Sequence, residues 1–162
     1  QILYNVPGRT AVDMSVDTTS RLSEISNIIG IKDATGDLSV IKELVAKCPE
    51  DFLLLTGDDA TAIDFLLLGG HGGISVTANV TPKELQKAYL AAIAGNAEVS
   101  KKLNEGLSGL HKNLFIESNP IPVKWALHKM GKCDNGIRLP LLELSNECKT
   151  VLENDLKELN LI

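Results

Sequence analysis

The sequence IIGIKDATG places a lysine where an apolar run gives way to polar residues. Lys32 directly follows the run 28–31, whose unbroken hydrophobicity is typical of a strand buried on both faces. Shielding from water favours the neutral amine, which is the form that attacks a ketone to give a Schiff base. The alternative is a structural lysine that forms an ion pair with Asp33, Asp58 or Asp59. The position therefore predicts either an amine nucleophile or an ion pair.

Two residues near the beginning of the chain could assist such an amine. Tyr4 lies in an apolar segment, and a phenol inside a site can carry protons to and from the nitrogen of a Schiff base. The alternative is a core tyrosine with a satisfied hydroxyl group. Arg9 follows Pro7 and Gly8 in a rigid turn, where its guanidinium could bind a carboxylate through two hydrogen bonds. The alternative for Arg9 is an ordinary surface arginine.

Short apolar segments that alternate with helical patterns must position these residues. The four predicted strands are residues 2–6, 28–31, 52–56 and 73–78. The three segments with helical spacing between them are residues 16–26, 36–48 and 59–70. This alternation predicts an α/β fold in which parallel strands are joined by right-handed helical crossovers. In such folds the working residues gather at the carboxyl ends of the strands, where Lys32 is expected.

The chain becomes wholly helical after the fourth predicted strand. Helices are expected at residues 81–95, 119–131 and 146–159, with one long helix that begins near residue 96. The long helix has a single apolar stripe, formed by Val99, Leu103, Leu107, Leu110 and Leu114.

Three of the predicted helices begin with capping signals. Asp17 and Asp37 are the candidate N-caps of the first two helices. Thr81 and Glu84 fit a capping box, with Pro82 at the first helical position. These residues predict where the helices start.

Four βα units do not close into an eight-stranded barrel, and they leave two sheet edges unpaired. A doubly wound sheet is an alternative, but no glycine-rich phosphate loop follows the first strand. The chain begins at Gln1 inside an apolar segment, which favours half of a larger barrel. The segment GGHGG, residues 69–73, precedes its strand and is predicted to be a tight turn rather than a phosphate site.

Composition restricts the classes of partner. A net charge of -5 and a pI near 5.2 argue against nucleic acid or an anionic membrane as the main partner. Cys48, Cys133 and Cys148 lack disulfide-scaffold or zinc spacing, so we expect reduced thiols and a cytoplasmic protein. The three histidines are far apart in the sequence and show no metal-ligand spacing, so no metal site is expected.

Five motifs together are more specific than any single residue, namely YNVPGRT, GIKDATG, LLTGDD, GGHGGISVTANV and ESNPIPVKWAL. They closely resemble the dihydrodipicolinate synthase family, class I aldolase-type enzymes of lysine and diaminopimelate biosynthesis. The resemblance implies a TIM (β/α)8 barrel with C-terminal helices, of which this chain matches strands five to eight and the helical tail. Residues 1–80 are then half of the barrel, and residues 81–162 are its last helix and a helical domain.

The resemblance also implies roles for five residues. Lys32 forms an imine with pyruvate, and Tyr4 donates and accepts protons at that centre. Arg9 binds the carboxylate of the second substrate, aspartate 4-semialdehyde. Gly57 and Ile74 line the site, and Ile74 contacts pyruvate through its backbone. No cofactor is implied, because the lysine itself forms the covalent bond, and a homotetramer or association with the missing half-barrel is expected.

Several family features are expected upstream of the chain, including a second tyrosine of the proton relay and the feedback site for lysine. We therefore expect this chain alone to be inactive or nearly so. An alternative enzyme is an N-acetylneuraminate lyase or a 2-keto-3-deoxy sugar-acid aldolase, against which Arg9 argues. A further alternative is a half-barrel that serves as a non-catalytic module.

Overall fold

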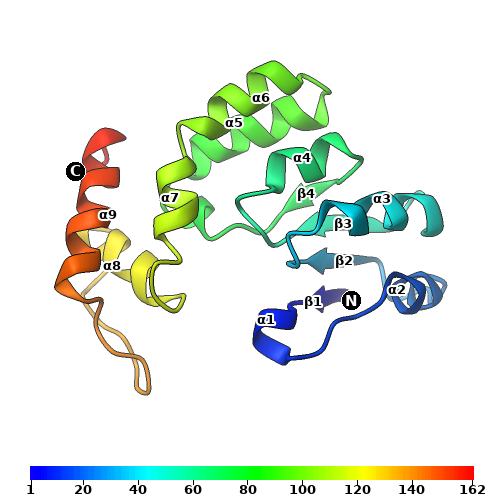
Figure 1. The fold of residues 1–162 in the computed structure, drawn as a ribbon, viewed down its shortest axis with the longest axis horizontal. Helices are drawn as coiled ribbons and strands as arrows, with labels where there is room; N and C mark the ends of the chain where they lie inside the picture. The colour runs from blue at the N-terminus through cyan, green and yellow to red at the C-terminus, as the bar shows by residue number, and fades with distance from the viewer.

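The computed structural model describes residues 1–162 and contains one parallel β-sheet with helices around it (Figure 1). The sheet has four strands in the order β1-β2-β3-β4. Their bounds are Ile2–Asn5 for β1, Gly30–Asp33 for β2, Leu53–Thr56 for β3 and Gly72–Gly73 for β4. All three strand pairings are parallel, so the expected α/β order is confirmed.

Short helices connect the strands, and their caps agree only in part with the prediction. The helices are α1 (Pro7–Thr10), α2 (Val16–Ser23), α3 (Leu38–Lys47) and α4 (Ala62–Leu67). Asp37 caps α3 as predicted. The prediction of Asp17 as the cap of α2 is wrong, because the Ser15 side chain accepts the hydrogen bond from the Thr18 amide. Asp17 lies in the first turn and instead forms an ion pair with Lys47 at 2.8 Å.

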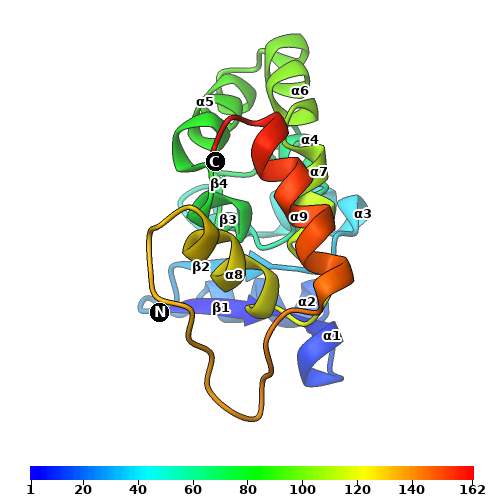
Figure 2. The ribbon, with the colours of Figure 1, turned by 90° about the vertical axis from the view of Figure 1, so that its left-hand side faces the viewer.

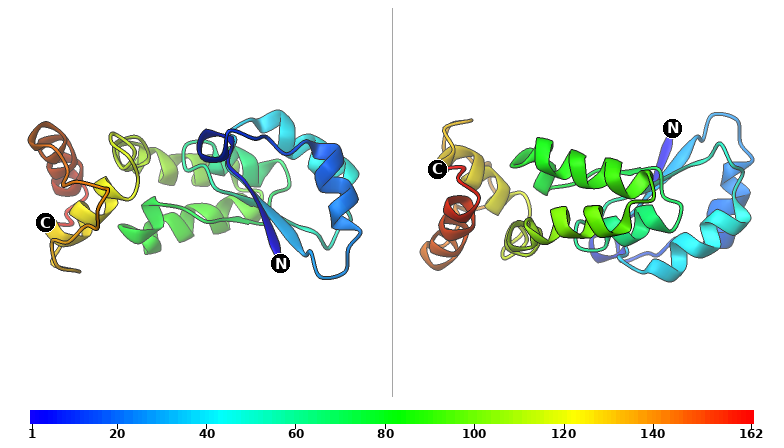
Figure 3. Two further views of the ribbon diagram at one scale, coloured as in Figure 1. Left: turned by 90° about the horizontal axis from the view of Figure 1, so that it is seen from below. Right: turned by 90° about the horizontal axis from the view of Figure 1, so that it is seen from above.

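The helices bury one face of the sheet, as Figure 3 shows for α2 and α3 along one side of the strands. Ile31 and Leu54 point to this side and are buried in one apolar cluster. On the opposite face Ile2, Tyr4 and Leu53 are 44%, 49% and 37% exposed. The expectation of strands buried on both faces is therefore wrong for this structure, and the open face is the one that carries Tyr4.

The fourth strand is much shorter than predicted. Only Gly72–Gly73 pairs with β3, and the chain then leaves the sheet and forms the 3-10 helix η1 (Thr77–Asn79). The buried carboxylate of Asp59 accepts hydrogen bonds from the amides of Val76 at 3.1 Å and Thr77 at 3.0 Å. These bonds hold the segment away from the ladder, which is why the prediction of a strand to residue 78 is wrong.

Five helices complete the chain: α5 (Pro82–Ile93), α6 (Ala97–Glu105), α7 (Ser108–Asn113), α8 (Ile121–Lys129) and α9 (Asn146–Glu158). Helix α5 begins at Pro82 as expected, but the capping box is wrong. The Thr81 side chain makes no capping bond and its hydroxyl points to the carbonyl of Thr77 at 3.5 Å. None of the helices combines the length and the apolar character needed to cross a membrane.

The single long helix expected from residue 96 is two helices, α6 and α7. The Leu107 amide bonds to the Asn104 carbonyl, three residues back, so the chain tightens between them. Val99 and Leu103 on α6 are 52% and 39% exposed, whereas Leu110 on α7 is fully buried. The two halves of the stripe face different surroundings, and this explains why one straight helix does not form.

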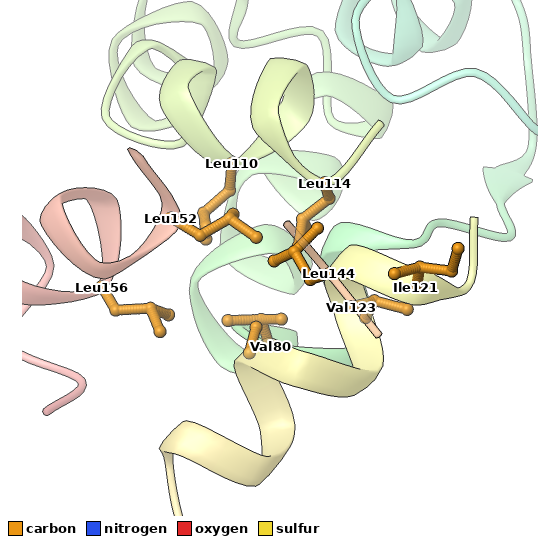
Figure 4. Close-up of a cluster of buried hydrophobic side chains, with 9 residues drawn as sticks. Val80, Leu110, Leu114, Ile121, Val123, Leu144, Leu152 and Leu156 are labelled. Carbon is orange, nitrogen blue, oxygen red and sulfur yellow. The ribbon is translucent and has the colours of Figure 1, made fainter. Parts of the chain in front are cut away.

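Helices α7, α8 and α9 stand together at one end of the molecule, away from α2 and α3 (Figure 1), and Figure 2 looks onto that end. Their cluster of nine buried apolar residues is the largest in the chain. Figure 4 shows side chains from α7, α8 and α9 converging there with Val80. The other two clusters lie beneath the sheet and between α4 and α5. The C-terminal helices therefore bury an apolar core of their own.

We expect Leu152→Ala to lower the free energy of unfolding by about 2–5 kcal/mol, because it leaves a cavity in the C-terminal core. Leu152 on α9 is fully buried in that cluster. Leu139→Ala is the matched control, because Leu139 is 83% exposed and its loss changes stability by less than about 0.5 kcal/mol. Urea unfolding measures both values, and equal effects of the two substitutions would contradict this packing.

Candidate active site

Tyr4 and Lys32 are neighbours on adjacent strands. The parallel register pairs Tyr4 of β1 with Lys32 of β2, and Lys32 in turn with Leu55 of β3. The Nζ atom of Lys32 lies 4.1 Å from the centroid of the Tyr4 ring, a distance at which the ring face attracts an ammonium group. The structure thus brings together the two residues that the sequence analysis predicted to be catalytic.

Lys32 forms none of the ion pairs in the chain. The three nearby carboxylates accept hydrogen bonds from other residues: Asp33 from Asn5 and Thr35, Asp58 from Thr61, and Asp59 from Val76 and Thr77. The structural alternative, a lysine paired with one of these aspartates, is therefore not what the structure contains. The amine is left available for chemistry.

Gly57 gives the Lys32 side chain its space. It directly follows β3, and its amide donates to the Asp33 carbonyl at 2.7 Å. A Cβ atom at this position would lie 2.6 Å from Cε of Lys32 and 2.9 Å from Cβ of Ala34. Real Cβ atoms do not approach other atoms so closely, so only glycine fits beside the lysine as it is placed here.

Asn5 is a residue of the site that the sequence analysis missed. It directly follows Tyr4 and is 3% exposed. Its Nδ2 donates to Asp13 at 2.8 Å and to Asp33 at 3.0 Å, and its Oδ1 accepts from the amide of Met14. These bonds tie the end of β1 to the end of β2 and so fix the register of Tyr4 beside Lys32. In the sequence, Asn5 could have been found as a polar residue that directly follows the predicted catalytic tyrosine.

Arg9 lies on the short helix α1, immediately after β1. Its side chain is exposed and takes part in none of the ion pairs of the chain. The turn that presents it ends at Ala11, whose φ of 55° is left-handed. The guanidinium is thus free to bind an external carboxylate, although no contact joins it to Lys32.

Ile74 borders the end of β3. Its amide donates to the carbonyl of Thr56 at 2.9 Å, and Thr56 is the register partner of Asp33. The carbonyl oxygen of Ile74 accepts no hydrogen bond from the chain, and the residue is 50% exposed. A backbone acceptor is therefore available directly after β4, which is separated from the strand of Lys32 by β3.

The remaining motifs have structural roles in this chain. Gly69 has a φ of 110°, which confirms the tight turn predicted for GGHGG. The ring of His71 accepts a hydrogen bond from the Leu54 amide at 3.0 Å and so joins the turn to β3. No group of three or more His, Cys, Asp or Glu side chains could hold a metal ion.

The sequence profile of the dihydrodipicolinate synthetase family matches residues 1–159. The chain belongs to the dihydrodipicolinate synthetase family. It is 61% identical over 162 residues to the 4-hydroxy-tetrahydrodipicolinate synthase of Ruthia magnifica, and 55% identical over 158 residues to that of Pseudomonas aeruginosa. These alignments cover 100% and 98% of this chain but only 55% and 54% of the relatives. The chain thus spans about half the length of the curated relatives it matches.

Solved structures of dihydrodipicolinate synthases share this fold. The enzyme of Acinetobacter baumannii, crystallised in complex with pyruvate, superposes with a TM-score of 0.97 at 52% identity. The match covers 99% of this chain and 55% of that one. The Aquifex aeolicus enzyme gives a TM-score of 0.96 at 41% identity, over 99% of this chain and 55% of the other. The backbone that positions Tyr4 and Lys32 is therefore similar to that of these dihydrodipicolinate synthases.

Proposed function

We propose that this chain carries the imine-forming part of a 4-hydroxy-tetrahydrodipicolinate synthase site, which condenses pyruvate with aspartate 4-semialdehyde in lysine and diaminopimelate biosynthesis. The observation that carries the proposal is the unpaired amine of Lys32, which stands 4.1 Å from the ring of Tyr4 at the ends of parallel strands. An amine without a carboxylate partner keeps its lone pair accessible once it loses its proton. Membership of the family supports the same chemistry.

The proposed reaction begins when the Lys32 nitrogen attacks the ketone carbon of pyruvate. Loss of water gives a protonated imine, which draws electrons from the adjacent methyl group. Loss of a methyl proton forms an enamine, and its carbon attacks the aldehyde of aspartate 4-semialdehyde. The amine of that substrate then attacks the imine carbon, so that the ring closes and Lys32 is released. The lysine supplies the covalent link, and the reaction needs no cofactor.

Four other residues have proposed roles around this imine. Tyr4 carries protons to and from the reacting centre, since its ring lies against the lysine and its hydroxyl makes no bond within the chain. Arg9 binds the carboxylate of aspartate 4-semialdehyde through its free guanidinium. Gly57 leaves the space that Lys32 occupies. The free carbonyl of Ile74 contacts bound pyruvate.

We further propose that the four strands are strands five to eight of a closed barrel. Unpaired edges at β1 and β4 and the exposed face with Ile2, Tyr4 and Leu53 support this proposal. Residues 1–80 would then be the half-barrel, and residues 81–162 its last helix and a helical domain. The complete enzyme is proposed to be a cytoplasmic homotetramer, and the isolated chain to condense its substrates poorly.

Borohydride trapping tests the proposed function. Reduction of the folded chain with pyruvate should add one pyruvate-derived group, located at Lys32 by peptide mass spectrometry. Imine formation needs only the amine and the ketone, so this step can be tested separately from the whole condensation. A folded sample that gains no mass would favour a non-catalytic module.

A matched pair of assays identifies the reaction in an assembled enzyme that contains this chain. We expect turnover with pyruvate and aspartate 4-semialdehyde and none in a sialate cleavage assay. Cleavage of sialate without condensation would reject the synthase in favour of a sugar-acid lyase.

A further inference from the structure

A buried row of polar side chains runs from the loop after β3 to the C-terminal helices. Asp59, Thr77 and His111 are 2%, 0% and 7% exposed. Oδ2 of Asp59 accepts from the Thr77 hydroxyl at 3.1 Å, and that hydroxyl lies 2.9 Å from Nδ1 of His111. Nε2 of His111 lies 3.0 Å from Oδ1 of Asn104 on α6. The row therefore links three separate parts of the chain, and neither the motifs nor the proposed reaction accounts for it.

The direction of these hydrogen bonds follows from the single proton of the Thr77 hydroxyl. Oδ2 of Asp59 already accepts the amides of Val76 and Thr77, so it acts as an acceptor toward the hydroxyl as well. Once Thr77 donates its proton to Asp59, its oxygen can only accept from His111. Nδ1 of His111 therefore carries a proton. Because Nε2 faces the acceptor Oδ1 of Asn104, the geometry needs a proton on both ring nitrogens, or an Asn104 amide turned so that Nδ2 donates to Nε2.

The charge of His111 depends on opposing influences. Burial lowers the pKa of His111, while the charges of Asp59 and Asp58 raise it. Both carboxylates belong to the loop after β3. The other ring nitrogen faces Asn104 and fixes the plane of the ring.

The row is connected to the site through the backbone after β4. Asp59 binds the amides of Val76 and Thr77, and Ile74 lies just before them with its own amide on Thr56. The other oxygen of Asp59, Oδ1, is buried and has no partner. All the hydrogen bonds of this buried carboxylate thus go to residues 76 and 77, so the loss of one partner would leave a buried acceptor unsatisfied, which is costly.

We propose that Asp59, Thr77 and His111 are positioning residues, which anchor the segment 74–77 to helix α7 and so hold the Ile74 carbonyl at the edge of the Lys32 site. This role rests on the proposed function for its effect on imine formation, but the hydrogen bonds can be tested without it. The C-terminal helices thereby contribute to the site although none of their residues touches the lysine.

The first test is the position of the imidazole proton in the wild-type chain. Two-bond ¹H–¹⁵N NMR spectra should show the proton of His111 on Nδ1 at pH 7. A ring protonated only on Nε2 would overturn the proposal, because Thr77 could not then donate to Asp59. This measurement needs no variant and no substrate.

The second test removes the hydroxyl with Thr77→Val. Amide exchange at positions 76 and 77 should accelerate about tenfold, since loss of one buried hydrogen bond has an effect of this size. The rate of imine trapping at Lys32 should fall by about the same factor, with the same final yield. Thr77→Ser keeps the hydroxyl and should restore both rates to within about twofold.

Thr19→Val is the matched control, because Thr19 is 1% exposed and its hydroxyl bonds only within its own helix turn. It should leave the exchange at Val76 and the trapping rate unchanged. Unchanged exchange in Thr77→Val, or equal effects of the two substitutions, would overturn the proposal. Failure of the wild-type chain to form any imine would instead reject the proposed function. In that case the position of the His111 proton and the amide exchange at residue 76 would still test whether Asp59, Thr77 and His111 anchor the segment 74–77.

Discussion

Lys32→Ala is expected to abolish imine trapping with pyruvate while the chain remains folded. The surface lysines are not positioned beside a proton-carrying group as Lys32 is beside Tyr4, so they compete poorly for the ketone. Lys32 alone stands at the end of a central strand against a tyrosine ring. Adduct formation should therefore fall by about 100-fold or more, to the level of the surface lysines. Intact-mass measurement after borohydride reduction gives the yield.

Lys32→Arg tests whether the amine or only its positive charge is needed, and Lys42→Ala is the control. Lys32→Arg keeps a cation that can stack on Tyr4, but guanidinium stays protonated and does not form imines. It should lose the adduct as completely as alanine does. Lys42→Ala removes an exposed lysine of α3 and should keep the full yield. A normal adduct in either Lys32 variant would show that another residue is the nucleophile.

Gly57→Ala is expected to slow imine formation by about 100-fold, which is the usual result of displacing a reacting group by about 1 Å. The new Cβ would lie 2.6 Å from Cε of Lys32. The lysine side chain is flexible and can move aside, but its amine then leaves the face of the Tyr4 ring. The contact of 2.9 Å with Ala34 adds strain of about 1–3 kcal/mol, so the free energy of unfolding should fall as well.

Gly136→Ala provides the matched control for this substitution. A Cβ atom at Gly136 meets nothing within 4 Å, and the residue lies in the loop before α9. It should change neither the trapping rate nor the stability by a measurable amount. Trapping at the wild-type rate in Gly57→Ala would show that the space beside Lys32 is not needed.

Much of the fold could be predicted from local patterns. Continuous apolar segments separated by helical spacing specify parallel strands, because such strands need helical crossovers. The cap at Asp37 and the end of α5 near Gly95, whose φ is 78°, also follow from short-range preferences. These features depend on residues close together in the sequence, so sequence reasoning finds them.

The error at the fourth strand arose because a distant residue overrides a local preference. Asp59 draws the segment after Gly73 out of the sheet by binding amides seventeen and eighteen residues away. At the end of α6 the local bond from Leu107 to Asn104 tightens the chain, and Leu110 and Leu114 then pack against residues of α8 and α9 that are distant in the sequence. Hydrophobic spacing contains no information about such partners.

The sequence by itself limited Lys32 to an amine nucleophile or an ion pair, because a lysine at the end of an apolar strand has few roles, and the motifs around it favoured the nucleophile. Only the tertiary structure decided that the amine is unpaired, since Asp33, Asp58 and Asp59 all lie near it in the chain or at the next strand end. Each carboxylate accepts hydrogen bonds from nearby amide and hydroxyl groups and not from Lys32. Which of these groups are close enough depends on how the strands are paired.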